Sequence, residues 1–309
     1  MRWSSGLHPS VTDIRRAFAT RHPLSGANNV QNLLRASAVA VAVSAFTVTP
    51  CLAQSSPQQA TSPRVLAQYE PQSGQAGKDV VWVPTPQALV DRMLDMAALT
   101  KDDYVIDLGS GDGRTVITAA KRGARAHGIE YNPDMVALAK HTAEAEGVAG
   151  RATFAQADIF QSDFSSASLI TLFLLPDLNV KLRPTLLDMR PGTRVVSNSF
   201  SMGDWQPDDS IEAGSGCVSW CRAHKWVVPA KVGGTWSLAD GSLRLTQTFQ
   251  MLDGTLTLGG QTLPISEARM NGAAIAFTAG GRRYNGQVAG TSMTGSVEGG
   301  RPWRASREG

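Results

Sequence analysis

Two periodicities of apolar residues divide this 309-residue chain. Over residues 78–230, short continuous apolar runs alternate with segments in which apolar residues recur every three or four positions. Continuous runs are typical of buried parallel strands, and the longer period is typical of amphipathic helices. Over residues 231–309, apolar and polar residues alternate instead, with glycine-rich turns between the segments. The pattern predicts an α/β domain, a doubly wound parallel sheet with helices on both faces, followed by a small antiparallel β domain.

Flanking residues place the elements of the α/β domain. Thr85 and Pro86 are typical of a helix N-cap and first helical position, and Asn132-Pro133 starts a helix that ends near Gly147. A further helix is expected over 178–189, with Pro184 as a candidate kink. The expected strands cover residues 104–108, 125–131, 152–157, 168–175, 193–200 and 224–229.

The C-terminal β domain is expected to be an antiparallel meander, either a small barrel or a curved sheet. Its alternating segments cover 235–238, 242–251, 254–258, 273–278, 282–288 and 292–297. Turns are expected at Asp240-Gly241, Asp253-Gly254 and Asn271-Gly272. The domain contains no catalytic cluster, which leaves two interpretations, a packing or oligomerising appendage and a ligand-binding barrel.

The first 53 residues have the order of a secretory signal. Arg35 precedes an apolar run over 36–48, and small residues follow at Cys51 and Ala53. This order predicts a signal peptide with a long n-region, cleavage after Ala53 and export, most simply to a periplasm. The run is too short for a comfortable transmembrane helix, so we expect no stable membrane span in the mature chain. Residues 54–77, rich in Gln, Ser, Pro and Gly, are expected to be a flexible linker.

Charge and cysteine usage narrow the possible partners. The net charge is +3, but residues 1–53 hold five Arg and one Asp, which leaves residues 54–309 at −1. This balance does not support a nucleic-acid partner. Cys217 and Cys221 are the only cysteines after residue 53. In an oxidising compartment a local disulfide is favoured over free thiols, provided that the segment forms a tight loop or helical turn. These two cysteines make a poor zinc site, and no metal site is expected.

A glycine-rich loop between a strand and a helix is the strongest chemical signal. Asp107 is followed by Gly109, Gly111 and Gly113, which gives the spacing D-x-G-x-G-x-G. Such a loop brings backbone close to a ligand at a helix N-terminus. Glu130 ends the next expected strand, where a carboxylate can accept two hydrogen bonds from a ribose diol. The residues therefore predict a site for a nucleoside-bearing cofactor.

The spacing of the loop selects the cofactor. A dinucleotide site normally has the spacing G-x-G-x-x-G, and an acid two positions before the first glycine would repel a pyrophosphate. The same acid suits a ligand with a cationic end, since opposite charges attract. S-adenosylmethionine (SAM) carries both an amine and a sulfonium. We therefore expect SAM as the cofactor.

The loop also resembles motif I of the class I SAM-dependent methyltransferases, which have a Rossmann-like doubly wound sheet. Trp82-Val83-Pro84-Thr85-Pro86, then a short helix and the motif, is similar to the family of the ATP synthase c-subunit lysine methyltransferase and its bacterial relatives. The resemblance covers about residues 80–205 and marks 78–230 as a methyltransferase domain. It implies that Asp158 accepts from the adenine amino group and that Pro84 and Thr85 line the site. The implied cofactor-binding set is Asp107, Gly109, Ser110, Gly111, Gly113, Glu130, Asp158, Pro84 and Thr85.

The resemblance also implies the reaction, methyl transfer to a nucleophile, with a protein lysine amine as the candidate acceptor. No catalytic base is evident in the sequence. Asp177 is at a position where other methyltransferases contact substrate, although the start of a surface helix explains it equally well. A protein partner would be the methyl acceptor.

Two features depart from the family, the export signal and the C-terminal β domain. SAM is made in the cytoplasm, so an exported enzyme lacks an evident cofactor supply. The alternative is an exported non-catalytic protein that binds SAM or a nucleoside, with a ligand-binding or interaction β domain. An NAD-dependent oxidoreductase is disfavoured by the spacing of the glycines.

Overall fold

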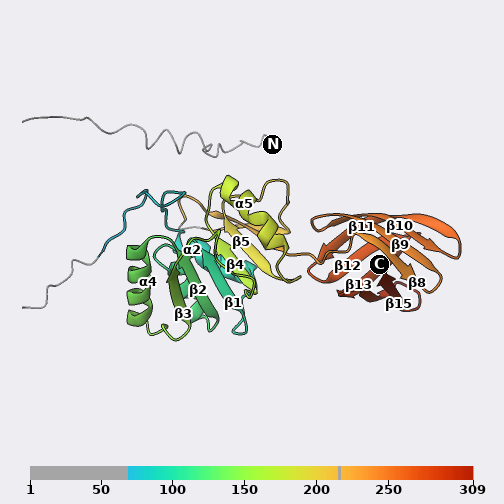
Figure 1. Cartoon of the computed structure of the whole chain (residues 1–309), viewed down its shortest axis with the longest axis horizontal. Helices are drawn as coiled ribbons and strands as arrows, with labels where there is room; N and C mark the ends of the chain where they lie inside the picture. The colour runs from blue at the N-terminus through green and yellow to red at the C-terminus, as the bar shows by residue number, and fades with distance from the viewer. Residues whose placement is uncertain (1–68, 215–216, 309) are drawn as a thin grey trace, which may run out of the picture. The chain divides into compact units, whose positions relative to one another are not determined.

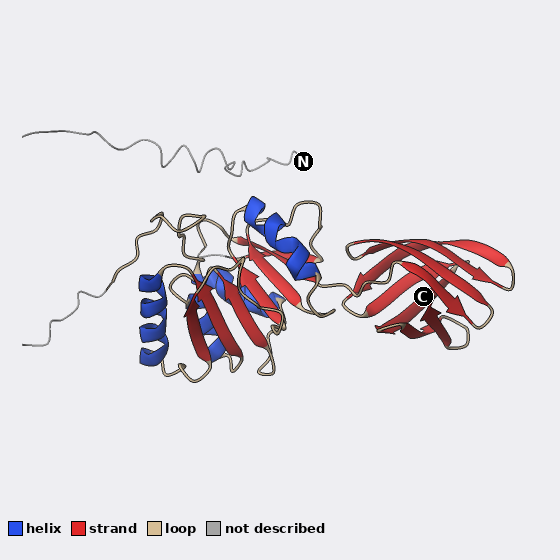
Figure 2. Cartoon of the chain, viewed as in Figure 1, coloured by secondary structure: helices blue, strands red, loops and turns tan. Residues whose placement is uncertain are grey.

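A computed structural model describes residues 69–214 and 217–308 of the chain. The expected signal peptide, its cleavage site after Ala53 and residues 54–68 of the expected linker lie outside the described residues. The described part contains a mixed α/β region and an all-strand region, which Figures 1 and 2 distinguish by residue colour and by secondary structure. No helix in the described ranges is long and apolar enough to cross a membrane.

The α/β region is built on a seven-stranded sheet with the order β3-β2-β1-β4-β5-β7-β6. Strands β3, β2, β1, β4 and β5 are parallel, whereas β7 is antiparallel to both β5 and β6. The strands are β1 Tyr104–Leu108, β2 Arg125–Glu130, β3 Ala152–Gln156, β4 Leu169–Leu172, β5 Arg194–Asn198, β6 Asp209–Glu212 and β7 Arg222–Val227. This is the predicted α/β fold, except that its last two strands form an antiparallel hairpin.

Helices cover both faces of the sheet, as predicted. They are α2 Gln87–Met96, α3 Arg114–Lys121, α4 Pro133–Ala145 and α5 Pro176–Leu187. The alternation of side chains along β1 separates two cores. Val105 packs with the buried residues of α2, α3 and α4, whereas Ile106 and Leu108 pack with Leu182 and Leu186 of α5. Each face of the sheet is therefore sealed by its own apolar cluster.

The start of α2 differs from the expectation. The helix begins at Gln87 with Pro86 as its N-cap, and no side chain caps it. The hydroxyl of Thr85 instead accepts a hydrogen bond from Asn198 Nδ2 at the end of β5, 3.2 Å away. Because Thr85 is recruited by the neighbouring strand, it ties the segment before α2 to the sheet. At α4 the prediction is confirmed, since the side chain of Asn132 accepts from Asp134 N and Met135 N.

The C-terminal region is a closed antiparallel barrel with the order β10-β11-β12-β13-β14-β15-β8-β9. The strands are β8 Gly234–Leu238, β9 Gly241–Thr248, β10 Met251–Leu258, β11 Gln261–Asn271, β12 Ala274–Ala279, β13 Arg282–Ala289, β14 Ser292–Val297 and β15 Trp303–Arg307. The expected meander is thus confirmed as a barrel. Its buried cluster contains Trp236, Phe277, Tyr284 and Trp303, large rings that fill the interior. The interpretation as a ligand-binding barrel gains no support from this filled core.

Two details of the barrel differ from the prediction. Asp253 and Gly254 lie inside β10, and the turn before this strand is formed by Phe249 and Gln250. Gly254 is needed there for packing, because a Cβ at this position would lie 1.9 Å from the carbonyl oxygen of Arg244 on β9. The alternation did not indicate strand β11, because this strand contains Pro264 and is interrupted by a bulge, with Glu267 at φ 49°.

Candidate functional site

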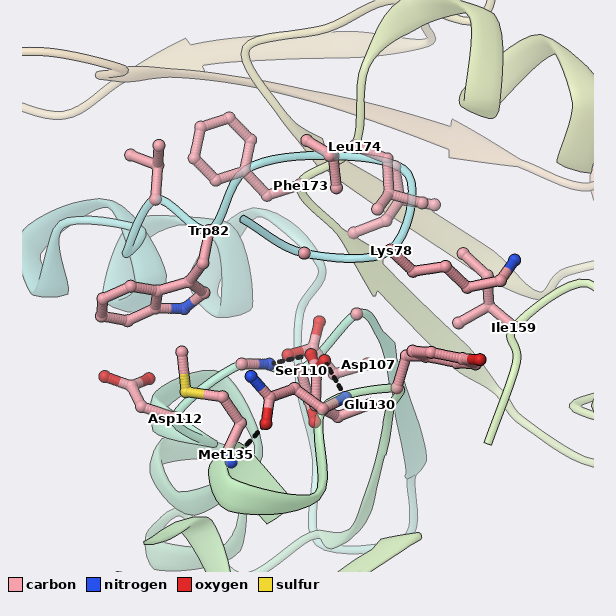
Figure 3. A pocket seen from close by; sticks show the side chains of 18 of the residues that line it. Lys78, Trp82, Asp107, Ser110, Asp112, Glu130, Met135, Ile159, Phe173 and Leu174 are labelled. Carbon is pink, nitrogen blue, oxygen red and sulfur yellow. Dashed lines mark hydrogen bonds between the residues drawn. The ribbon is translucent and has the colours of Figure 1, made fainter. Parts of the chain in front are cut away.

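A cavity with about 1030 Å³ of empty volume, part of it open to solvent, lies at the carboxyl ends of β1, β2 and β4. Ligands of open α/β sheets bind at this edge of the strands. Figure 3 shows Phe173 and Leu174 from the end of β4 on one side of the cavity, with Glu130 and Met135 opposite them.

The glycine loop after β1 forms the floor of the cavity. Gly109 has φ 80° and Gly111 has φ 53°, a region that side chains disfavour. The N–H groups of Gly109 and Ser110 both donate to the carbonyl oxygen of Ile129 on β2, at 2.9 and 3.1 Å. The loop is therefore held against β2, and Gly109 and Gly111 border the cavity with backbone alone, since neither has a side chain.

Glu130 at the end of β2 holds the loop and also faces the cavity. Its Oε2 accepts from Gly111 N and its Oε1 accepts from Asn132 N, both at 2.9 Å. Each carboxylate oxygen has two lone pairs, so both oxygens keep capacity for a further donor. The side chain is thus fixed in orientation before a ligand arrives, and it can accept from two neighbouring hydroxyl groups.

Asp107 is buried at the base of the cavity, with 7% of its surface exposed. Its Oδ1 accepts a hydrogen bond of 2.6 Å from the hydroxyl of Thr171 on β4. Burial raises the pKa of Asp107 to about 7, and the nearby carboxylates of Glu130 and Asp112 contribute to this rise against the opposing effect of Thr171. A cationic ligand would favour the ionised form of this group.

Asp158 lies two residues beyond β3 at the same edge of the sheet. Its Oδ1 accepts from Phe160 N at 2.9 Å, and its Oδ2 lies 3.1 Å from Lys78 Nζ. The backbone hydrogen bond from Phe160, followed by the contact with Lys78, lowers the pKa of Asp158. The carboxylate is therefore ionised and available as an acceptor at the rim of the cavity.

Residues 75–85, which we call the cover segment, line the cavity along their whole length. Trp82 N donates to Gln75 O at 2.9 Å and Gly74 N donates to Trp82 O at 2.7 Å, which closes the segment into a loop. The indole of Trp82 lies against Gly111, where a Cβ would be 2.4 Å from Nε1. Residues 75–77 were expected to belong to a flexible linker, but they line the cavity, and Gln75 is hydrogen-bonded to Trp82.

Eight of the nine predicted site residues line this one cavity. They are Pro84, Thr85, Asp107, Gly109, Ser110, Gly111, Glu130 and Asp158. Gly113 is the exception, because it lies at the N-cap of α3 and not in the lining. A Cβ there would be 2.8 Å from Ala139 of α4 and from the ring of Phe154 on β3. Gly113 therefore permits close packing between helices and sheet and does not border the ligand space.

Several lining residues were not predicted. Trp82 belongs to the segment 82–86 on which the family resemblance rests, and Ile159 directly follows Asp158, so neighbouring positions could have indicated both residues. Lys78 and Met135 carried no signal of their own. Asp177, for which substrate contact and the start of a surface helix were equally good explanations, is exposed at the start of α5 and lies outside the lining. Its role as the start of a surface helix accounts for what is seen.

Comparison with known proteins gives a consistent result for this half of the chain. A model of the ANTKMT methyltransferase domain matches residues 107–209. The protein-lysine N-methyltransferase of Saccharolobus islandicus is 43% identical over 140 residues, which cover 44% of this chain and 87% of that protein. The human lysine N-methyltransferase of the ATP synthase c-subunit is 34% identical over 128 residues, 41% of this chain. The chain spans 54% of the length of this human relative.

Among solved structures, an RNA methyltransferase from Salinibacter ruber in complex with S-adenosyl-L-homocysteine is 45% identical. The match covers 48% of this chain and 96% of the Salinibacter chain, with a TM-score of 0.45. The region matched by the family model ends before the barrel, and none of these four matches extends over the whole chain.

Proposed function

We propose a protein lysine as the methyl acceptor of this chain, which belongs to the same methyltransferase family as the protein-lysine N-methyltransferase of Saccharolobus islandicus. The protein is a SAM-dependent methyltransferase. The lysine assignment is supported by the matched relatives, whose names specify protein lysines.

The observation that carries the SAM assignment is that Asp107, Glu130 and Asp158, from the ends of three neighbouring strands, are among the acidic residues that line one glycine-floored cavity. SAM fits this set of acceptors, because its ribose hydroxyls, adenine amino group and cationic methionine end each need an acceptor or a negative charge. Glu130 would hold the ribose, Asp158 the adenine amino group, and Asp107 would face the cationic end. The indole of Trp82 lies so close to Gly111 that no Cβ would fit between them. The backbone of Gly111 and the indole therefore border a narrow part of the cavity.

The chemistry needs alignment more than it needs a protein nucleophile. When bound, SAM supplies an electrophilic methyl group on a sulfonium sulfur. The residues of this chain then orient the ligand and exclude water, and the acceptor amine must approach in line with the breaking bond. A lysine amine has to be neutral to attack. No histidine lines the cavity in the described residues, and we assign Glu130 and Asp158 to positioning of the cofactor.

The raised pKa of Asp107 gives SAM binding a pH dependence. Because the ionised carboxylate attracts the sulfonium, we expect the Kd for SAM to fall by up to about tenfold as the pH rises from about 6 to about 7.5. The stability of the ligand-free protein changes with pH in the opposite direction. Because the pKa of Asp107 is raised in the folded state, protonation of Asp107 favours folding, and this contribution is lost as the pH rises through about 7. Titration calorimetry across this range should show a flat profile for Asp107→Asn.

The acceptor can be tested with labelled cofactor. The protein is incubated with methyl-tritiated SAM and a periplasmic extract, the extracted proteins are hydrolysed, and the amino acids are separated. We expect the label in methylated lysines, and Glu130→Gln as the matched control should reduce incorporation strongly. Label recovered in RNA, or in other amino acids only, would refute the lysine assignment and leave the methyltransferase assignment intact.

We also propose that the protein is exported to an oxidising compartment. The order of charged, apolar and small residues before Ala53 supports this proposal. The predicted disulfide between Cys217 and Cys221 is present, and such bonds persist in oxidising compartments. N-terminal sequencing of the protein from a periplasmic fraction should begin at Gln54, and a chain that retains the apolar run would contradict the proposal.

A further inference from the structure

Three aromatic rings form one cluster beside the cofactor cavity. The ring centroids of Phe173 and Phe200 are 6.0 Å apart, and that of Trp220 lies 5.8 Å from Phe173 and 5.6 Å from Phe200. All three side chains are only half-buried. We call these residues the aromatic triad. Rings of a core would be sealed from solvent, whereas these keep surface available to a ligand.

The sheet topology places the triad at the same edge as the cavity. Phe173 follows β4, Phe200 lies two residues beyond β5, and Trp220 lies two residues before β7. Because β7 is antiparallel to β5, its beginning lies at the carboxyl end of β5. The cofactor cavity uses the ends of β3, β2, β1 and β4, and the triad uses β4, β5 and β7. The two halves share β4, since Phe173 also lines the cavity (Figure 3).

Hydrogen bonds hold the triad to the pocket wall. The hydroxyl of Ser199 donates to Asn198 Oδ1 at 2.7 Å, and Asn198 Nδ2 donates to Thr85 of the cover segment. Buried Asn179 of α5 donates from Nδ2 to the carbonyl oxygens of Phe200 and Ser201, at 3.3 and 3.2 Å. Phe200 is thus fixed from two sides, and its position is coupled to that of the cofactor-binding residues.

The third ring is held by a covalent constraint. Trp220 precedes Cys221, which is bonded to Cys217 four residues earlier. Its backbone has φ 57°, a conformation that is uncommon for a bulky residue and persists only when the surroundings enforce it. Ala213 N donates to Cys221 O at 2.7 Å, which anchors the loop to the β6–β7 hairpin. The disulfide therefore fixes the indole against the other two rings.

From these contacts we propose that the aromatic triad is the subsite for the acceptor lysine, with the Cys217–Cys221 disulfide as the device that positions Trp220. The inference rests on the proposed function. During transfer the amine nitrogen bonds to the methyl carbon, the carbon–sulfur bond breaks, and its electron pair stays on sulfur. The positive charge moves from sulfur to nitrogen, and the nitrogen then releases a proton to water. Aromatic faces stabilise such an alkylammonium and also pack against the lysine methylenes.

A binding experiment tests the subsite without turnover. The probe is N-acetyl-Nε-trimethyllysine methyl amide, titrated into the full mature chain saturated with S-adenosylhomocysteine. Its neutral isostere, with carbon in place of the ammonium nitrogen, is the chemical control. We expect the probe to bind about tenfold more tightly than the isostere, and Trp220→Ala to remove about the same factor.

Matched variants separate recognition from folding. Trp220→Phe should retain most of the affinity, and Val218→Ala, fully exposed on the same loop, should leave it unchanged. The double variant Cys217→Ser/Cys221→Ser should bind the probe more weakly than the wild type, while its Kd for S-adenosylhomocysteine stays constant.

The subsite would be overturned by no binding of the probe to the wild-type chain, by equal binding of probe and isostere, or by equal affinity of the wild type and Trp220→Ala for the probe. A parallel loss of S-adenosylhomocysteine affinity would also overturn it, since it would assign the triad to the cofactor site. Because the measurement requires no methyl transfer, its failure is distinguishable from a failure of the labelling experiment for the proposed function.

Discussion

Replacing Glu130 by Gln is expected to weaken SAM binding by roughly 10- to 150-fold. The carboxylate accepts from Gly111 N and Asn132 N, and ribose hydroxyls would add two more donors. An amide has one acceptor oxygen, so its NH₂ group would face a backbone N–H or a ribose hydroxyl. Hydrogen bonds to a charged group contribute about 1.5–3 kcal/mol, which corresponds to this range of Kd.

Titration calorimetry with SAM measures the effect, and the melting temperature reports on folding. Glu144→Gln makes the same chemical change on the exposed surface of α4, outside the cavity lining, and should leave the Kd for SAM unaltered. If a folded Glu130→Gln variant had an unchanged Kd for SAM, the proposal that Glu130 binds the ribose would be wrong.

The second large effect is expected for Gly111→Ala. A Cβ at this position would lie 2.4 Å from Nε1 and 2.9 Å from Cδ1 of Trp82, so the indole would have to move. Because Trp82 belongs to the cover segment, its displacement opens the cavity wall. Overpacking of this kind costs about 1–3 kcal/mol, and we expect SAM affinity to fall by roughly 5- to 150-fold.

Gly147→Ala is the matched control for the backbone. Gly147 has φ 68°, close to the 53° of Gly111, but no atom lies within 4 Å of its ideal Cβ. Both variants carry the conformational cost of a left-handed alanine, whereas only Gly111→Ala meets a neighbour. Adding Trp82→Ala to Gly111→Ala should restore part of the affinity if the clash is the cause. Equal SAM affinities for the two single variants would contradict the explanation.

The sequence was informative where a residue type is demanded by its neighbours in the chain. Asp107 and Glu130 end buried apolar runs, and parallel strands bring such ends to one edge of the sheet. The glycine spacing could be recognised because the turn excludes side chains at fixed intervals. These local requirements predicted the parallel part of the sheet and the acidic half of the site.

The sequence was silent where position depends on distant packing. The cover segment has no periodicity, so nothing in it indicated that Trp82 would lie against Gly111 or that Lys78 would reach Asp158. Strand β7 was expected over 224–229, but β6 had no signal, because Asp209–Glu212 contains a single apolar residue. The composition of a strand does not indicate whether it runs parallel or antiparallel to its neighbours. Because β7 is antiparallel to β5, Trp220 lies at the edge of the sheet where the cofactor cavity is found.

Closure of the barrel constrains the order in which its strands can pair during folding. Its first strand, β8, pairs with its last, β15, through Trp236 and Arg307, about seventy residues apart. Strand β8 lacks its second partner until β15 is available, so the barrel can close only when all eight strands are present. Loop-closure entropy makes such end-to-end pairing slow. Closure of the barrel is therefore expected to be a late step in the folding of this region, after its internal hairpins have formed.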